Sequence, residues 1–150
     1  MIAFLLVAAM AFGSQPDTPE RLRARISTET NPVQKARLEI RLADLLLEQT
    51  RKQYTDGDDD KGLASLNDMM TNCESAYQQL FGTHRDPRSK PAGFKDTEIR
   101  MREFVRRLND LRLTLASDER PPLDKAIERL RDMHDDLLSG IMRVRKKENP

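Results

Sequence analysis

Apolar residues recur at alternating spacings of three and four along several long segments, and Gly or Pro residues separate these segments. The clearest series are Leu63, Leu66, Met70, Cys73, Tyr77 and Leu80; Met101, Phe104, Leu108, Leu111 and Leu115; and Leu123, Ile127, Leu130, His134, Leu137, Ile141 and Val144. This spacing places the side chains of a series on one face of a helix, where they can pack against a second helix. The pattern therefore predicts an all-α fold of helices that lie side by side.

Signals for the start and end of helices divide the chain further. Thr18 before Pro19, and Asn31 before Pro32, each combine a capping side chain with Pro at the first helical position. Gln34 stands where it would complete a capping box with Asn31. The predicted helices are 19–28, 32–54, 60–81, one from 94 or 95 to 115, and one from the Pro pair at 121–122 to about 145.

The predicted helix 32–54 is apolar on two faces. One face carries Leu38, Leu42, Leu45 and Leu46, and nearly the opposite face carries Ala36, Ile40, Ala43 and Leu47. Two apolar faces require neighbours on both sides, so we expect this helix to be central. With one short helix before it, the pattern predicts an antiparallel bundle, or stacked helical hairpins, of four long helices.

Composition limits the partners and the sources of stability. Lys and Arg number 26 and Asp and Glu number 25, and this balance argues against nucleic acid as a partner. The chain has no Trp and few aromatic residues, which favours helices over strands. Because Cys73 is the only cysteine, no disulfide can form within the chain.

The first residues indicate export. Residues 1–13 are almost wholly apolar and uncharged, and a polar stretch follows them, as in a signal peptide cleaved after Gly13. The apolar run 2–12 would span roughly 16 Å as a helix, too little for a hydrocarbon core of about 30 Å. We therefore expect a signal peptide at 1–13 and one helical domain at 14–150, in the periplasm or outside the cell. A retained anchor or a mis-assigned start are the alternatives.

Two connections between the predicted helices have distinctive residues. In the acidic turn, Asp56, Asp58 and Asp60 match the first ligands of an EF-hand calcium loop. Lys61 stands where that loop requires Gly, and Asn67 where it requires Glu, so the aspartates are better explained as caps and dipole partners of the next helix. The second connection, 82–93, is rich in Gly, Pro and basic residues, which predicts a mobile surface loop.

Four residues are candidate ligands for a soft metal ion such as Cu(I). His134, Cys73, Met70 and Met101 occupy apolar series of different helices, and their sulfur and nitrogen atoms could meet in one core. Packing explains them better, because Met fills irregular gaps, a free Cys behaves as a small apolar residue, and His can satisfy its ring nitrogens at the edge of a bundle. We therefore expect no metal site and no cofactor.

Basic residues gather in two places. The first group is Arg100, Arg102, Arg106, Arg107 and Arg112, which could bind phosphates or an acidic partner but are better explained by pairing with Glu98, Glu103 and Asp110. The second group is Arg143, Arg145, Lys146 and Lys147, which could contact anionic lipid or complement the negative end of a helix.

The chain carries two resemblances. The turn around Gly57-Asp58, with Tyr54 before it and the small residue Gly62 after it, resembles the middle of a single tetratricopeptide repeat, which implies a closely packed helical hairpin. The whole mature chain resembles uncharacterised exported helical proteins of acidobacteria. The residues that carry this second resemblance are Asn31-Pro32-Val33-Gln34-Lys35, Gly57-Asp58, Pro91-Ala92-Gly93-Phe94-Lys95 and Glu119-Arg120-Pro121-Pro122.

No nucleophile motif, metal-ligand pair or phosphate-binding loop stands out in the sequence, so we expect a protein that is not an enzyme. The favoured hypothesis is a protein-binding or scaffold domain of the bacterial cell envelope. Two alternatives stay open: a periplasmic metal-binding or stress protein that uses Met, Cys and His, and a peripheral membrane protein with a basic C-terminus. The partner's identity, the pathway and the oligomeric state stay open as well.

Overall fold

The computed structural model describes residues 16–142, and this part of the chain is entirely helical with no strand. Its five helices are α1 Pro19–Thr28, α2 Pro32–Thr55, α3 Asp59–Phe81, α4 Phe94–Thr114 and α5 Pro121–Met142. The bounds of α1 to α4, and the start of α5, lie close to the predicted ones. The predicted signal peptide and the basic C-terminal group lie outside the described residues.

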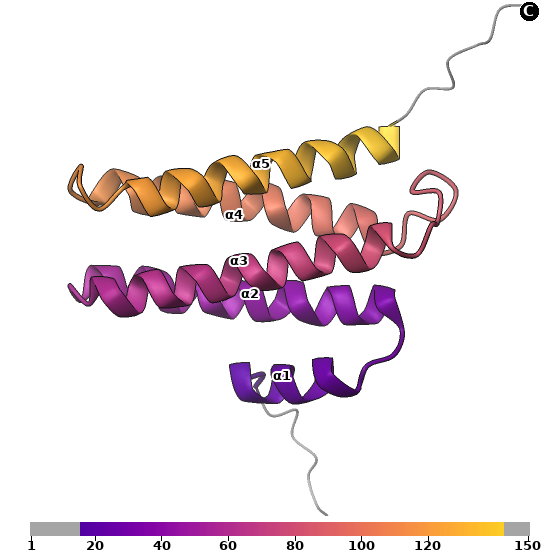
Figure 1. Cartoon of the computed structure of the whole chain (residues 1–150), viewed down its shortest axis with the longest axis horizontal. Coiled ribbons are helices and arrows are strands. Elements are labelled where there is room, and N and C mark those ends of the chain that lie inside the picture. Colours follow the sequence, from indigo (N-terminus) through magenta and orange to yellow (C-terminus); the bar gives the residue numbers. More distant parts are fainter. Residues whose placement is uncertain (1–15, 143–150) are drawn as a thin grey trace, which may run out of the picture.

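The helices pack as two pairs, an arrangement consistent with a bundle. α2 and α3 lie along each other, as do α4 and α5, and the pairs meet more sparsely through contacts of α2 and α3 with α4 and of α3 with α5 (Figure 1). The short α1 packs mainly against α2, and its Arg23 also pairs with Asp68 of α3 at 2.6 Å. The prediction that α2 has neighbours on more than one side is confirmed, because it contacts α1, α3 and α4.

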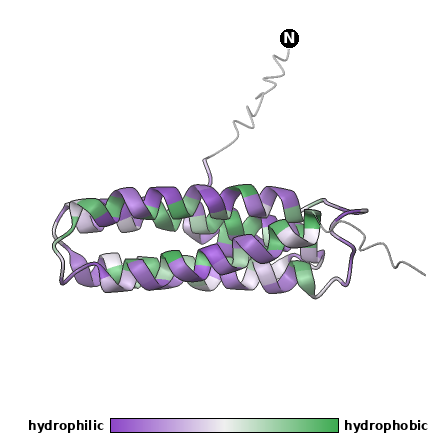
Figure 2. Cartoon of the chain, turned by 90° about the horizontal axis from the view of Figure 1, so that it is seen from above, coloured by the Kyte–Doolittle hydropathy of each residue, from purple (hydrophilic) through white to green (hydrophobic). Residues whose placement is uncertain are grey.

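Apolar side chains between the helices form one core. Every residue of the predicted series from Met101 to Leu115 is buried, and Leu108 is fully so. Figure 2 shows hydrophobic and hydrophilic residues alternating along the helices, as amphipathic helices require. Burying a Leu side chain contributes about 1.5–3 kcal/mol, so this core can hold the helices together without a cofactor.

In α3 and α5, some of the most buried residues are the sequence neighbours of the predicted ones, one position earlier in the chain. In α3, Met69 and Ala76 are fully buried, whereas Met70 and Tyr77 are only half-buried. In α5, Met133 is fully buried, and His134 lies at the edge of the core. α3 packs mainly against α2, so the most buried face of α3 is turned toward α2. The flank of α3 beside that face is turned toward α5.

Two predicted helix caps form, and one of them differs in detail. The hydroxyl of Thr18 accepts a hydrogen bond from the Arg21 amide at 3.3 Å, as predicted. The side chain of Asn31 accepts from the amides of Val33 and Gln34 at 3.0 and 3.1 Å. The reciprocal bond that was expected from Gln34 comes instead from Glu29, whose carboxylate accepts from the Asn31 amide at 2.8 Å.

The acidic turn between α2 and α3 caps the next helix less directly than predicted. Gly57 has a φ of 76°, which suits glycine and permits the sharp reversal. Asp58 occupies the N-cap position, but its side chain makes no capping bond and pairs with the Lys61 ammonium at 2.7 Å. This hydrogen bond lowers the pKa of Asp58. Asp59 and Asp60, in the first turn, complement the helix dipole as expected.

The connection from α3 to α4 is anchored at its far end by Gly93. This residue is buried with a φ of 87°, and a Cβ there would lie 2.8 Å from Leu80 Cδ2 and 2.9 Å from Val33 Cγ1. Within the loop, the side chain of Asp86 accepts from the Arg88 amide at 3.0 Å. Close packing at Gly93 thus ties the start of α4 to α2 and α3.

Candidate binding groove between α3 and α5

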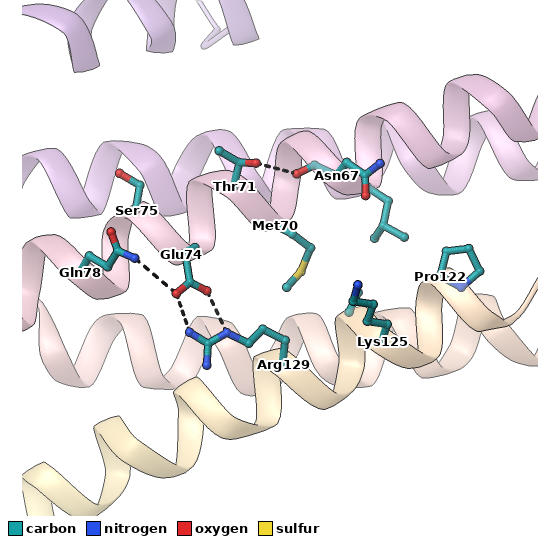
Figure 3. A pocket seen from close by; sticks show the side chains of 11 residues that line it. Asn67, Met70, Thr71, Glu74, Ser75, Gln78, Pro122, Lys125 and Arg129 are labelled. Atoms are coloured by element: carbon teal, nitrogen blue, oxygen red, sulfur yellow. Dashed lines mark hydrogen bonds and ion pairs between the residues drawn. The ribbon is translucent and has the colours of Figure 1, made fainter.

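A groove of about 510 Å³ lies between α3 and α5 (Figure 3). Its apolar lining comes from both helices and consists of Leu66, Met70, Pro122 and Ala126. Met70 is half-buried because it stands on the flank of α3 that faces α5, beside the fully buried stripe. In Figure 3 the Met70 side chain points from α3 toward α5. A volume of this size lies within the range of about 300–1,000 Å³ that ligand sites occupy.

Polar side chains surround the apolar lining. α3 contributes Asn67, Thr71, Glu74, Ser75 and Gln78, and α5 contributes Lys125 and Arg129. Apart from the adjacent pair Glu74 and Ser75, they recur every three or four residues, so they follow the length of the helices instead of converging on one point. An apolar floor with a polar rim is typical of surfaces that bind other proteins.

A bidentate ion pair crosses the groove. Arg129 donates from Nε and Nη2 to the two carboxylate oxygens of Glu74, at 2.9 and 2.5 Å. This hydrogen bonding raises the pKa of Arg129. Arg129 also lies 5.8 Å from the centre of the Tyr77 ring, and the Tyr77 hydroxyl donates to Asp136 at 2.8 Å. These contacts join α3 to α5 and set the separation of the two helices at one end of the groove.

Lys125 is the cation of the groove without a carboxylate partner among the described residues. Its side chain is exposed, and in Figure 3 its ammonium points from α5 toward α3. The groove lining contains two cations, Lys125 and Arg129, against the single carboxylate of Glu74. Since Glu74 is paired with Arg129, Lys125 leaves the groove with an excess of positive charge.

The structure separates the four predicted metal candidates by environment. Met70 lines the groove, whereas Cys73 and Met101 are fully buried in the core. Burial also raises the pKa of the Cys73 thiol, which disfavours the thiolate that binds metals. Within residues 16–142, no group of three or more His, Cys, Asp or Glu side chains could hold a metal ion.

His134 has a polar role that the sequence did not predict. Its Nε2 lies 2.8 Å from Oε1 of Glu98, and its Nδ1 lies 2.9 Å from Oδ1 of Asp135. Glu98 is a carboxylate on α4 with only 6% of its surface exposed. His134 therefore lies at the edge of the bundle with both ring nitrogens satisfied, as expected, but its link from α5 to a buried acid of α4 was not predicted.

The arginines of α4 pair in two ways. Arg100, Arg102 and Arg106 pair with Glu103, Glu98 and Asp110 on their own helix, at 3.1, 4.0 and 3.6 Å, as predicted. Arg107 instead contacts Asp44 and Glu48 of α2, and Arg112 contacts Asp124 of α5. These two arginines link helices, which the sequence did not predict.

Sequence reasoning missed Glu39, a buried acid on α2. This residue is 3% exposed, its Oε1 accepts a hydrogen bond from the Ser75 hydroxyl at 2.7 Å, and its buried Oε2 has no hydrogen-bond partner within residues 16–142. Burial raises the pKa of Glu39, and the bond from Ser75 opposes that shift. The available signal was its position between Leu38 and Ile40, which belong to the two apolar faces of the helix.

No family model, curated protein or solved structure matches the chain. None of the described helices combines the length and the apolar character needed to cross a membrane. An account of function must therefore start from the groove and from the charges around it.

Proposed function

We propose that the protein is an exported, helical, protein-binding domain of the bacterial cell envelope, and that a partner protein binds in the groove between α3 and α5. In this proposal the four long helices form an antiparallel bundle of two stacked hairpins. Residues 1–13 serve as a signal peptide that directs the domain to the periplasm or the cell exterior.

The observation that carries the proposal is the groove itself, because its apolar floor opens to the surface between two helices. Met70 and Pro122 are half-buried and offer apolar contacts, whereas Leu66 and Ala126 are buried beneath them, and the surrounding amides and charges can satisfy the polar groups of a partner. Rigid helices hold both walls, so little ordering would be needed when a partner binds.

A binding role fits the chemistry of the reactive groups better than catalysis does. Glu74 and Arg129 are bonded to each other, and the Cys73 thiol is buried with a raised pKa. A general base must be free to take a proton from a substrate, which the ion pair of Glu74 opposes, and a nucleophile must reach its substrate, which the burial of Cys73 prevents.

Crosslinked pull-down from an envelope fraction tests the proposal. The tagged full chain is compared with Met70→Asp, which places a charge in the groove, and with Leu113→Asp as the matched control. Leu113 is 71% exposed on α4 and does not line the groove. We expect wild type and Leu113→Asp to capture the same partner proteins and Met70→Asp to lose them. Circular dichroism should confirm that all three baits are folded. Identical capture by all three folded proteins would contradict the proposed use of the groove.

A further inference from the structure

The shape of the groove restricts what can occupy it. On α3 the lining extends from Leu66 to Gln78, twelve positions along one helix. At about 1.5 Å per residue this is roughly 18 Å, or a little over three helical turns. An amphipathic helix presents its apolar side chains over the same repeat, and such helices commonly bind in grooves of this kind.

The charge of the groove restricts the occupant further. Arg129 is held by both carboxylate oxygens of Glu74, so the charge left for a partner is the ammonium of Lys125. Lys125 lies near the N-terminal end of α5, where the helix dipole also favours negative charge. The acid of this first turn, Asp124, is engaged by Arg112 of α4. The end of the groove formed by Pro122 and Lys125 therefore favours an anion.

We infer that the occupant is an acidic, amphipathic helical segment of the partner protein. Its apolar side chains contact Met70 and Pro122, which are the half-buried apolar residues of the lining, and one of its carboxylates pairs with Lys125. This inference rests on the proposed function and specifies the chemistry of the partner. A basic segment would place its cations against Lys125, and like charges in contact weaken binding.

Two labelled synthetic peptides test this inference. Both are helical with Leu at positions i, i+4 and i+7, and they differ only in carrying Glu or Lys at the polar positions. Fluorescence anisotropy measures the Kd of each peptide for the full chain, for Lys125→Glu and for the control Lys95→Glu. Lys95 is also exposed, and it lies on α4 outside the groove lining.

We expect wild type and Lys95→Glu to bind the acidic peptide about three- to tenfold more tightly than the basic one, and Lys125→Glu to reverse this preference. Raising the salt concentration to 0.5 M should reduce the preference, since salt screens exposed charges. Equal binding of both peptides, no binding of either, or an unchanged preference in Lys125→Glu would each overturn the inference.

The pull-down separates failure of the inference from failure of the proposed function. If Met70→Asp loses a partner that Lys125→Glu still captures fully, the groove remains the binding site, but the inference that its occupant is acidic is refuted. A partner retained by Met70→Asp would refute the use of the groove altogether. Sedimentation of the full chain with phosphatidylglycerol vesicles, abolished by Lys125→Glu, would identify a lipid surface in place of a protein and would also overturn the inference.

Discussion

The link between Glu98 and His134 allows a sharp test of how α4 and α5 are held together. Glu98 is 6% exposed, and its Oε1 lies 2.8 Å from Nε2 of His134. Arg102 also lies near Glu98, but its Nε is 4.0 Å from the carboxylate, beyond hydrogen-bond distance. Replacing His134 by Leu fills a similar volume but leaves the buried carboxylate without its close partner.

The expected loss follows from the cost of an unpaired buried acid. A hydrogen bond to a charged group contributes about 1.5–3 kcal/mol, and removing one partner of a buried pair costs up to about 3–5 kcal/mol. Because the His134 side chain retains 17% exposure, water can reach part of the site, and we expect His134→Leu to lower the free energy of unfolding by about 2–4 kcal/mol. If His134 were only a member of its apolar series, His134→Leu would change the free energy of unfolding only modestly.

Urea unfolding followed by circular dichroism measures the loss. Asp135→Asn is the control, because Asp135 contacts the other ring nitrogen of His134 but is 76% exposed at its side chain, so its effect should stay under about 0.5 kcal/mol. The double variant Glu98→Leu with His134→Leu should be more stable than His134→Leu alone, since it removes the orphaned carboxylate. A His134→Leu midpoint equal to that of wild type, or a double variant less stable than the single one, would refute the reasoning.

Three further predictions concern the core, the buried acid and the loop. Leu108→Ala and Leu42→Ala should each destabilise the fold by about 2–5 kcal/mol in urea, whereas Leu113→Ala at an exposed site should change it by under about 0.5 kcal/mol. Burial raises the pKa of Glu39, so the folded state holds this proton more tightly than the unfolded state, and stability should fall as pH rises through the raised pKa. Glu39→Gln should remove that part of the pH dependence and be the more stable protein at pH 7 in thermal melts; an unchanged pH profile would contradict this. Brief trypsin treatment should cut first at Arg85, Arg88 or Lys90, and first cuts at Arg41 or Arg107 would mean that the loop is not the most accessible segment.

Much of the fold was predictable because its determinants are local. Pro19 and Pro32, with their capping residues, define two helix starts, and Gly57 marks a reversal that the backbone confirms with a positive φ. These features act within a few residues of one another, so a single sequence displays them directly.

The rotation of each helix about its own axis was less predictable. Neighbouring positions differ by about 100° around a helix. The placement of the adjacent helices therefore decides which residue of a neighbouring pair is buried, as for Met69 and Met70 or Met133 and His134. α3 turns its buried face toward α2, which buries Met69 and leaves Met70 on the flank. No local signal distinguishes the two positions, because both are Met.

The same limit explains why Met70 is the one residue of the groove that sequence reasoning named as a candidate binding residue. The groove exists because α3 and α5 lie side by side, and its ion pair joins Glu74 to Arg129 across 55 positions of the chain. In the sequence, both residues look like members of ordinary charged helix faces. Their pairing neutralises the carboxylate of Glu74 and leaves Lys125 as the groove cation without an ion pair in the described part of the chain, so the preference that we infer for an acidic partner arises from tertiary contacts and not from any motif.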